Sequence, residues 1–297
     1  MKNAILLSGF LRHFFVTSDT INKISDLYNA DIFVVCPISN HLKMNYKLGW
    51  TGSFINRESL TKEYIKSIYK NVKDILFVNH IPFFDSMLQQ EIDETKNAVM
   101  NNINNVTVYK KEMYDFLNET ESYDYIKSCL NQYLQFYTCF ELMDSYSKRN
   151  NIKYENVVRI RPDTFFIGNI ENIFDQLFSS NTKLNTIRRP EPNIYIDFVF
   201  GGNYDNMKKM SNLYKHIFKK FDINDKYNHT IEGHISNYMR ENMEVNVLKD
   251  IEFNDKCFYH NIINDKDKGP YYKDIFDKYT QKYDIPLDKL LVFYIEG

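Results

Sequence analysis

Cysteine is scarce in this sequence, and the few that occur exclude two kinds of small, cross-linked fold. The chain has four, Cys36, Cys129, Cys139 and Cys257, which lie far apart and include no Cys-x-x-Cys pair. Disulfide frameworks and zinc ribbons need closer spacing. Three of the four stand in apolar segments, where a free cysteine packs as a small hydrophobic side chain. We therefore expect reduced cysteines and a reducing compartment, which indicates the cytoplasm.

The sequence also lacks long runs of basic residues and long runs of apolar residues. The net charge is −2 and the pI is near 6.4, and no long basic stretch provides the footprint of a nucleic-acid-binding protein. No apolar stretch approaches the length of a membrane-spanning helix, about 20 residues. The N-terminal segment has only a short apolar run and no small-residue cleavage site, so we expect no signal peptide. The Asn-x-Thr sequons at Asn105, Asn118 and Asn228 are then interpreted as chance matches.

The remaining composition is that of an ordinary globular protein, with 43% hydrophobic and 26% charged residues. Aromatic residues reach 16%, with 23 Tyr and 23 Phe but one Trp. This excess is spread along the whole chain together with Asn, Lys and Ile, so we attribute it to an AT-rich genome rather than to sugar stacking. A chain of this size hides roughly 75% of its unfolded surface. No internal repeat or linker divides it, and we expect one domain over residues 1–297.

The first 80 residues alternate between buried strands and amphipathic helices. Continuous apolar runs that end at turn residues are typical of strands in a parallel sheet. Apolar residues at helical spacing separate these runs. The sequence predicts strands at 3–9, 30–39 and 74–80, with helices at 20–29 and 57–69. This order indicates βαβ units and a mostly parallel central sheet flanked by helices.

The rest of the chain is less regular. Residues 85–120 are polar and Asn-rich, and we interpret them as an insertion. The patterns further along predict helices at 124–150, 205–221 and 230–242, a strand at 155–166, two short strands within 183–207 and a late strand at 245–254. The tail from Gly269 is expected to wrap the surface. The fold class is therefore α/β, a single domain with a less regular C-terminal half.

The first candidate site is the segment Ser8 to Arg12, which follows the first strand. Ligands of open α/β sheets bind at the carboxyl ends of the strands. Gly9 allows the backbone to approach a phosphate closely, Ser8 supplies a hydroxyl, and Arg12 can bind phosphate oxygens in a fork. The segment matches neither the three-glycine dinucleotide motif nor a Walker A loop. A simple turn followed by a surface charge is the alternative.

The second candidate site is the end of the fourth predicted strand, ENVVRIRPDTFF. Strand alternation places Arg159 and Arg161 on one face, and Asp163 has the same parity. Two cations and one carboxylate at a strand end suit a diphosphate, with the acid holding a ribose hydroxyl or a divalent metal. The alternative is a structural ion-pair cluster, because buried charges must be paired in any case.

These two segments carry a resemblance to a known family. A first strand ending in Ser-Gly-x-x-Arg, a long helix bearing Gln132, and the run Val157 to Asp163 resemble glycosyltransferase-like proteins of bacterial polysaccharide clusters and large DNA viruses. That family adopts the nucleotide-sugar-binding GT-A type of Rossmann-like α/β fold. Its Arg-x-Arg-x-Asp stands where many GT-A enzymes carry Asp-x-Asp. The similarity covers about residues 1–260.

The resemblance implies sugar transfer from a nucleotide-diphospho-sugar to a saccharide or glycan acceptor. Residues 1–166 would bind the donor, and residues 167–297 would form the acceptor side and the tail. It implies Mn²⁺ or Mg²⁺ at Asp163, completed by His260, although one carboxylate stands here where the enzyme motif has two. Gln132 is implied as a contact to the base or sugar, ahead of Gln135. The location implied is the cytoplasm, that of the host if the protein is viral.

Two acids are candidates for the base that removes the acceptor proton in an inverting transfer. Asp197 precedes an aromatic strand and the pair Gly201-Gly202, in a segment that the resemblance assigns to the acceptor side. The glycines allow close approach of a sugar or of backbone. Glu232 lies near a predicted helix start, where the helix dipole alone could explain a carboxylate. His234 is interpreted as structural.

Two other functions remain open from the sequence. A sulfotransferase, or another nucleotide-dependent transferase, also uses residues after the first strand but needs a fuller phosphate loop than LLSGFLR. A non-catalytic carbohydrate-binding protein could keep the same fold. Binding of nucleotide sugars against 3′-phosphoadenosine phosphosulfate separates the transferases, and turnover separates both from the binding protein.

Overall fold

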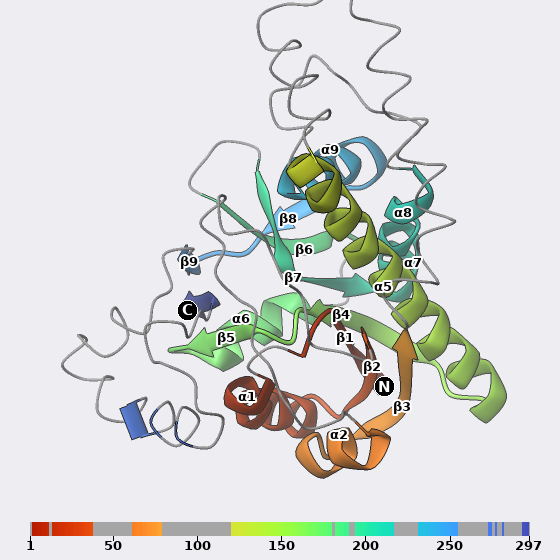
Figure 1. Ribbon diagram of the computed structural model, residues 1–297, viewed down its shortest axis with the longest axis vertical. Coiled ribbons are helices and arrows are strands. Elements are labelled where there is room, and N and C mark those ends of the chain that lie inside the picture. The colour runs from red at the N-terminus through yellow and green to blue at the C-terminus, as the bar shows by residue number, and fades with distance from the viewer. Residues whose placement is uncertain are drawn as a thin grey trace, which may run out of the picture.

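The protein is an α/β structure in which one seven-stranded sheet lies between two layers of helices (Figure 1). The computed structural model describes residues 2–11, 14–37, 61–78, 120–179, 182–189, 194–216, 231–254 and 293–296, with isolated positions at 273, 274, 277 and 281. A mostly parallel sheet flanked by helices was predicted from the sequence, and this part of the prediction is confirmed.

The sheet has the strand order β3-β2-β1-β4-β7-β6-β8. Its strands are β1 (Lys2–Ser8), β2 (Ala30–Pro37), β3 (Val72–Val78), β4 (Tyr154–Ile160), β6 (Leu184–Arg188), β7 (Tyr195–Asn203) and β8 (Val245–Val247). All neighbours are parallel except at β7, which runs antiparallel to both β4 and β6. Strands β2 and β3 extend from one side of β1 and β4 from the other, so the topological switch point lies between β1 and β4.

The helices cover both faces of the sheet. Their bounds are α1 (Phe14–Leu27), α2 (Lys62–Ile68), α5 (Thr120–Asn150), α6 (Ile170–Leu177), α7 (Tyr204–Ser211), α8 (Leu213–His216) and α9 (Ile231–Asn242). Apolar residues of α5, α7, α8 and α9 share one core with one face of the sheet, and those of α1, α2 and α6 share a second core with the other. None of the described helices combines the length and the apolar character needed to cross a membrane.

Alternation within the strands divides the two cores. Val157 of β4 packs in the core beneath α5, whereas Val158 and Ile160 pack in the opposite core. Strands β1 and β2 are buried along nearly their whole length, which explains their continuous apolar sequences. For the same reason the first three predicted strands match the observed strands within two residues at each end.

Two helices end at an asparagine in the left-handed backbone region. Asn29 follows α1 with a φ of 46°, and Asn151 follows α5 with a φ of 52°. Asparagine tolerates this conformation, which closes the last helical turn. At the other end of a helix, the side chain of Asn203 accepts a hydrogen bond from the backbone of Asn206 and thereby caps α7. These caps fix the lengths of the helices that surround the sheet.

The segment Arg161-Pro162-Asp163 is a turn rather than the continuation of a strand. The sequence predicted one strand over 155–166, but β4 ends at Ile160. Proline cannot donate to the ladder, and the backbone of Thr164 donates to the carbonyl of Arg161 across the turn. The chain then enters β5 (Thr164–Ile167), which belongs to a second sheet with β9 (Glu252–Asn254) and β10 (Phe293–Glu296).

Several other element boundaries differ from the prediction. The predicted strand 245–254 is two strands, β8 and β9, in different sheets, and helix α6 was not predicted. The tail contributes β10 to the small sheet instead of only wrapping the surface. Helix 205–221 is divided into α7 and α8 by a turn at Asn212, with its last residues outside the described part. The predicted insertion at 85–120 also lies outside it, apart from its last residue.

Candidate functional site

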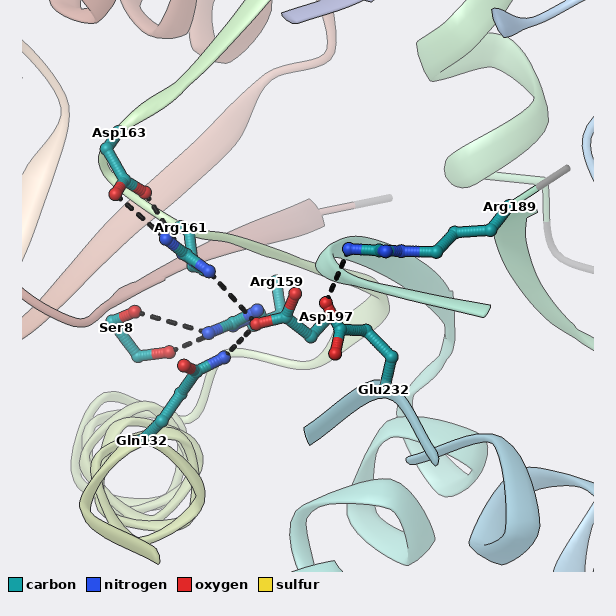
Figure 2. A network of polar contacts seen from close by, with 8 residues as sticks. All are labelled: Ser8, Gln132, Arg159, Arg161, Asp163, Arg189, Asp197 and Glu232. Carbon is teal, nitrogen blue, oxygen red and sulfur yellow. Dashed lines mark hydrogen bonds and ion pairs between the residues drawn. The ribbon is translucent and has the colours of Figure 1, made fainter. Parts of the chain in front are cut away.

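A network of charged and polar side chains lies at the carboxyl edge of the sheet, beside the switch point (Figure 2). Ser8 ends β1, Arg161 follows β4, and Asp197 stands in the first half of the antiparallel strand β7. The β4–β7 register pairs Arg159 with Phe200, and the backbone of Arg161 donates to the carbonyl of Phe198 at 2.8 Å. This pairing brings Asp197 next to the end of β4, 36 residues from Arg161 in the sequence.

Arg161 is held by two carboxylates. Its Nε and Nη2 donate to Oδ1 and Oδ2 of Asp163 at 3.0 and 2.9 Å, a bidentate pair across the turn. Its Nη1 donates to Oδ2 of Asp197 at 3.1 Å. The guanidinium also lies over the ring of Phe198, with Cζ 4.2 Å from the ring centroid. Each of the three guanidinium nitrogens therefore donates to a carboxylate oxygen.

Arg159 is placed differently, although it stands on the same face of β4. Its Nε donates to Oγ of Ser8 at 3.2 Å, and Nη2 makes a long contact of 3.5 Å to the carbonyl of Ser8. Its Cζ lies 5.6 Å from the ring centroid of Phe200. The residue is only 1% exposed, and its Nη1 has no hydrogen-bond partner among the described residues. Within the described ranges it makes no ion pair with a carboxylate.

Helix α5 contributes Gln132 to the network. Its Nε2 donates to Oδ2 of Asp197, the same oxygen that accepts from Arg161 (Figure 2). Asp197 is 1% exposed, and its other oxygen, Oδ1, has no partner in the part of the chain that the structure describes. The carboxylate of Asp197 is thus anchored through one oxygen and carries an unused acceptor on the other.

Helix α9 contributes Glu232 in its first turn. Its Oε1 accepts from Nη2 of Arg189 at 2.7 Å, and both side chains are largely buried. The hydroxyl of Ser236, one turn further along α9, accepts from the backbone of Tyr195 at 2.8 Å and ties the helix to the start of β7. This attachment places Glu232 close enough to Asp197 for their charges to interact.

Burial and neighbouring charges shift three pKa values in this network. Burial lowers the pKa of Arg159 to about 10, and the attraction of Asp197 only partly offsets this. For Arg161 burial acts in the same direction, but the carboxylates of Asp163 and Asp197 outweigh it and raise the pKa. Burial raises the pKa of Glu232 and the negative charge of Asp197 adds to the increase, against the opposing effect of Arg189.

The structure brings together most of the residues that the sequence singled out. Figure 2 shows Ser8, Gln132, Arg159, Arg161, Asp163, Asp197 and Glu232 in one network. Arg159 lies in the last part of β4, and Arg161 and Asp163 lie in the turn that follows, while their role in donor binding stays a prediction. Arg12 and His260 lie outside the described residues, so their predicted roles stay predictions.

Gly9 is shaped by the neighbouring turn. Its φ of 135° favours glycine, and an added Cβ would lie 3.5 Å from Cδ of Pro162. The backbone N–H of Gly9 donates to the carbonyl of Val35 at 3.1 Å, so it takes part in the sheet. Thr17 of α1 donates its hydroxyl to the carbonyl of Pro162 at 2.7 Å. The loop after β1, helix α1 and the Arg-Pro-Asp turn are thereby fixed against one another.

Gly201 and Gly202 permit close approach of the protein's own chain. A Cβ on Gly201 would lie 2.7 Å from Cγ2 of Val158 and 2.9 Å from the carbonyl of Leu177. A Cβ on Gly202 would lie 3.3 Å from the carbonyl of Lys183. Of the two possibilities that the sequence allowed, the described residues therefore support backbone approach for this pair.

Sequence reasoning did not single out Arg189, and it ranked Gln135 below Gln132. Arg189 directly follows β6, which ends at Arg188. A charged residue immediately after a predicted strand was the available signal. Gln135 was noted beside Gln132 and ranked below it, yet it is 1% exposed and its Nε2 has no partner among the described residues.

The arrangement of Asp163 bears on the predicted metal site. Both of its carboxylate oxygens accept hydrogen bonds from Arg161, and the side chain is buried. A divalent cation at Asp163 would have to displace a bidentate guanidinium, so the residue as placed does not fit a metal ligand. Asp197 has a free carboxylate oxygen by contrast, in the described part of the chain.

The chain matches no protein-family model, and no curated protein matches its sequence. The function is therefore argued from the geometry and the charge of this site. Within the part of the chain that the structure describes, Arg159 has one donor and Asp197 one carboxylate oxygen without a partner, and the pKa of Glu232 is raised. Together these groups can bind an anion and accept a proton.

Proposed function

We propose that the protein is a glycosyltransferase that moves a sugar from a nucleotide-diphospho-sugar to a saccharide or glycan acceptor. The observation that carries the proposal is the position of the network. Charged side chains from β4, β7 and α9 converge with polar groups from β1 and α5 at the carboxyl edge of a mostly parallel sheet (Figure 2). The crevice beside the switch point of such a sheet is where ligands bind. The similarity of the Ser-Gly-x-x-Arg and Arg-x-Arg-Pro-Asp segments to GT-A glycosyltransferases adds the substrate class.

The proposed reaction is a displacement at the anomeric carbon of the donor sugar. The acceptor hydroxyl oxygen forms the new bond to that carbon as the bond to the phosphate oxygen breaks. The electron pair of the broken bond leaves with the nucleoside diphosphate, and the hydroxyl proton passes to a protein base. Hydrogen-bond donors of the protein that point at the leaving phosphate stabilise the negative charge that develops there.

Glu232 suits the role of base better than Asp197 does. Oδ2 of Asp197 accepts from both Arg161 and Gln132, so this oxygen is already engaged with protein groups. Among the described residues the carboxylate of Glu232 has one hydrogen-bond partner, Arg189, and burial raises its pKa. A base with a pKa nearer to neutrality removes a hydroxyl proton more effectively. In this proposal Asp197 orients Arg161 and Gln132, and Glu232 accepts the proton.

The charge of the site limits how the donor is held. Arg159 and Arg161 are matched in number by Asp163 and Asp197, so a diphosphate would enter a cluster that is formally neutral. Arg12, after β1, is proposed as a further cation for the phosphates. A divalent metal is the other possible source of positive charge. Activity is therefore measured with and without a metal, and no step of the proposed mechanism relies on one.

We also propose a reducing compartment, the cytoplasm, for this reaction. Cys36 and Cys139 are free and buried. Burial raises the pKa of both thiols and keeps them in the unreactive protonated form. The proposed partners are small molecules, the nucleotide sugar and the saccharide acceptor.

The experiment that tests the function is a turnover screen. The protein is incubated with UDP-, GDP- and dTDP-sugars and with 3′-phosphoadenosine phosphosulfate, each with and without Mn²⁺. Release of the nucleoside diphosphate, or of adenosine 3′,5′-bisphosphate from the sulfate donor, is measured. We expect one donor class to release its nucleoside diphosphate slowly by hydrolysis and faster by sugar transfer when an acceptor is present, and E232Q to lose both activities. Turnover of 3′-phosphoadenosine phosphosulfate instead would identify a sulfotransferase. Donor binding without any turnover would identify a carbohydrate-binding protein.

A further inference from the structure

The two arginines of the Arg-x-Arg-Pro-Asp segment have opposite pairing. Arg161 contacts both neighbouring carboxylates, Asp163 and Asp197, within 3.1 Å. Arg159 contacts neither, and in the described ranges its donors reach only the hydroxyl and the carbonyl of Ser8. Its Nη1 is without a partner there. Two residues that look equivalent in the sequence are therefore in different electrostatic states.

A buried arginine in this state is unusual. Arginine is almost never fully buried without a partner, because removing its charge from water is costly. The large majority of buried side-chain polar atoms have a hydrogen-bond partner, and the exceptions call for an explanation. Arg159 is 1% exposed, and burial depresses its pKa to about 10. The site would be more favourable with an anion beside Nη1.

Helix α5 carries a second buried donor that has no partner in the described part of the chain. Helix α5 contacts Asp197 through Gln132, and two turns later Sγ of Cys139 lies 3.5 Å from the carbonyl of Phe33 and 3.9 Å from that of Leu7. Gln135 stands between these contacts, buried, and its Nε2 has no partner among the described residues. Within the described ranges, helix α5 therefore also carries a buried amide donor without a partner.

We propose that Arg159 is the residue that binds an oxyanion in this site, with Ser8 beside it, and that Arg161 is a positioning residue. The ligand group is a phosphate oxygen, which accepts from a guanidinium in short charge-assisted hydrogen bonds. Its identification with the diphosphate of a sugar donor rests on the proposed function. The oxyanion site itself does not, because it stands on the burial of Arg159 and on a donor without a partner among the described residues.

A purely structural Arg159 makes different predictions. In that case it would serve to hold Ser8 and to cover the ring of Phe200, and removing it would loosen the end of β1. If Arg159 binds an oxyanion, its buried charge destabilises the protein when no ligand is bound. Replacing a buried charge that lacks a direct counter-ion by an apolar side chain of similar length is then neutral or stabilising.

The experiment compares R159M with the wild-type protein and with R149M. Arg149 is an exposed arginine near the end of α5, so R149M makes the same chemical change away from the site. Melting temperatures are measured in metal-free buffer as sodium pyrophosphate is added at constant ionic strength. A ligand that binds only the folded state raises the melting temperature. We expect a rise of about 3 °C or more in the wild type and in R149M, and less than about 1 °C in R159M.

The same data contain the second arm of the test. Without pyrophosphate, R159M is expected to melt at or above the wild-type temperature. A wild-type protein that does not respond to pyrophosphate, or an R159M variant that responds like the wild type, overturns the proposal. If R159M does not fold, R159K keeps the cation and loses the fork. Pyrophosphate is then expected to bind at least about tenfold more weakly, and unchanged affinity overturns the assignment.

The result separates this proposal from the proposed function. Pyrophosphate binding through Arg159, in a protein that turns over no nucleotide sugar, keeps the oxyanion site and removes the glycosyltransferase. Turnover of a nucleotide sugar that persists in R159M with an unchanged KM keeps the enzyme and removes Arg159 from donor binding.

Discussion

Arg161 binds Asp163 through two parallel hydrogen bonds of 3.0 and 2.9 Å, across a turn of which Pro162 is the only intervening residue. The same guanidinium reaches Asp197 at 3.1 Å and thereby ties the turn to β7. The Arg-x-Arg-Pro-Asp sequence suggests two cations that are free to bind a ligand. In the structure its second arginine, Arg161, instead forms a closed cluster of ion pairs with Asp163 and Asp197. Its physical effect is to hold the end of β4 and the start of β7 in one arrangement.

This closed cluster predicts a large effect of R161M on stability. The substitution leaves the carboxylates of Asp163 and Asp197 buried without their cation. Breaking a buried pair in this way costs about 3–5 kcal/mol in the free energy of unfolding. Urea denaturation at neutral pH measures the change.

The control for R161M is R149M. Arg149 pairs with Asp74 at 3.2 Å, but its side chain is 63% exposed. Exposed pairs contribute below about 1 kcal/mol, because water and salt screen them. Equal losses in the two variants would contradict the assignment of Arg161 as the structural centre of the network.

The pH dependence of turnover follows from Glu232. The base must be ionised to accept a proton, and burial raises the pKa of Glu232 above its ordinary value near 4.5. Activity is therefore expected to fall as the pH drops, with the midpoint of this acid limb above the ordinary glutamate range. A rate–pH profile of kcat measures the limb. An acid limb at or below pH 4.5 would show that another group, or an unperturbed one, is the base.

Arg189 is expected to set the position of that limb. Its positive charge favours the ionised form of Glu232 and so lowers the pKa. Removal of this charge in R189Q raises the pKa further, and the acid limb of kcat moves to higher pH. Activity at high pH is recovered, because Glu232 is then ionised again. A uniform loss of activity at all pH values, with no shift of the limb, would indicate a structural role for Arg189 only.

The packing of Gly201 predicts an asymmetry between two adjacent glycines. G201A places a Cβ 2.7 Å from Cγ2 of Val158 and 2.9 Å from a backbone carbonyl, and such overpacking costs about 1–3 kcal/mol. In G202A the nearest atom is 3.3 Å away, so the loss is expected to be smaller. Thermal unfolding of both variants measures the difference. A large increase in KM for the acceptor in a fully stable G201A would instead indicate that this glycine faces a sugar.

The architecture could be predicted where burial dictates the sequence. Strands β1 and β2 are covered on both faces, so their residues are apolar without interruption, and they were placed within two residues. Helix α6 and strand β5 are short, with eight and four residues, and give too few periods for a pattern to be recognised. Strand β10 was not predicted, because its partner β5 lies more than a hundred residues earlier in the chain and no local pattern indicates the pairing.

The members of the site could also be predicted in part, but their partners could not. Alternation placed Arg159 and Arg161 on one face of β4. The pairing of Arg161 with Asp197 depends on the antiparallel register of β4 and β7, which no local spacing contains. The contrast between the two arginines has the same origin. Arg189 was missed because its role depends on helix α9 packing against the start of β7, which brings Glu232 to it.

If the carboxyl edge of the sheet binds a nucleotide-sugar donor, as proposed, calorimetric titration detects that binding without requiring turnover. UDP-, GDP- and dTDP-sugars and 3′-phosphoadenosine phosphosulfate are titrated into the wild type, R159M and K73M. Lys73 pairs with Asp31 towards the amino ends of β2 and β3, so K73M is a control far from the site. We expect one sugar nucleotide to bind the wild type and K73M equally and R159M at least about tenfold more weakly. Binding of 3′-phosphoadenosine phosphosulfate alone, or of no sugar nucleotide at all, would contradict this proposal.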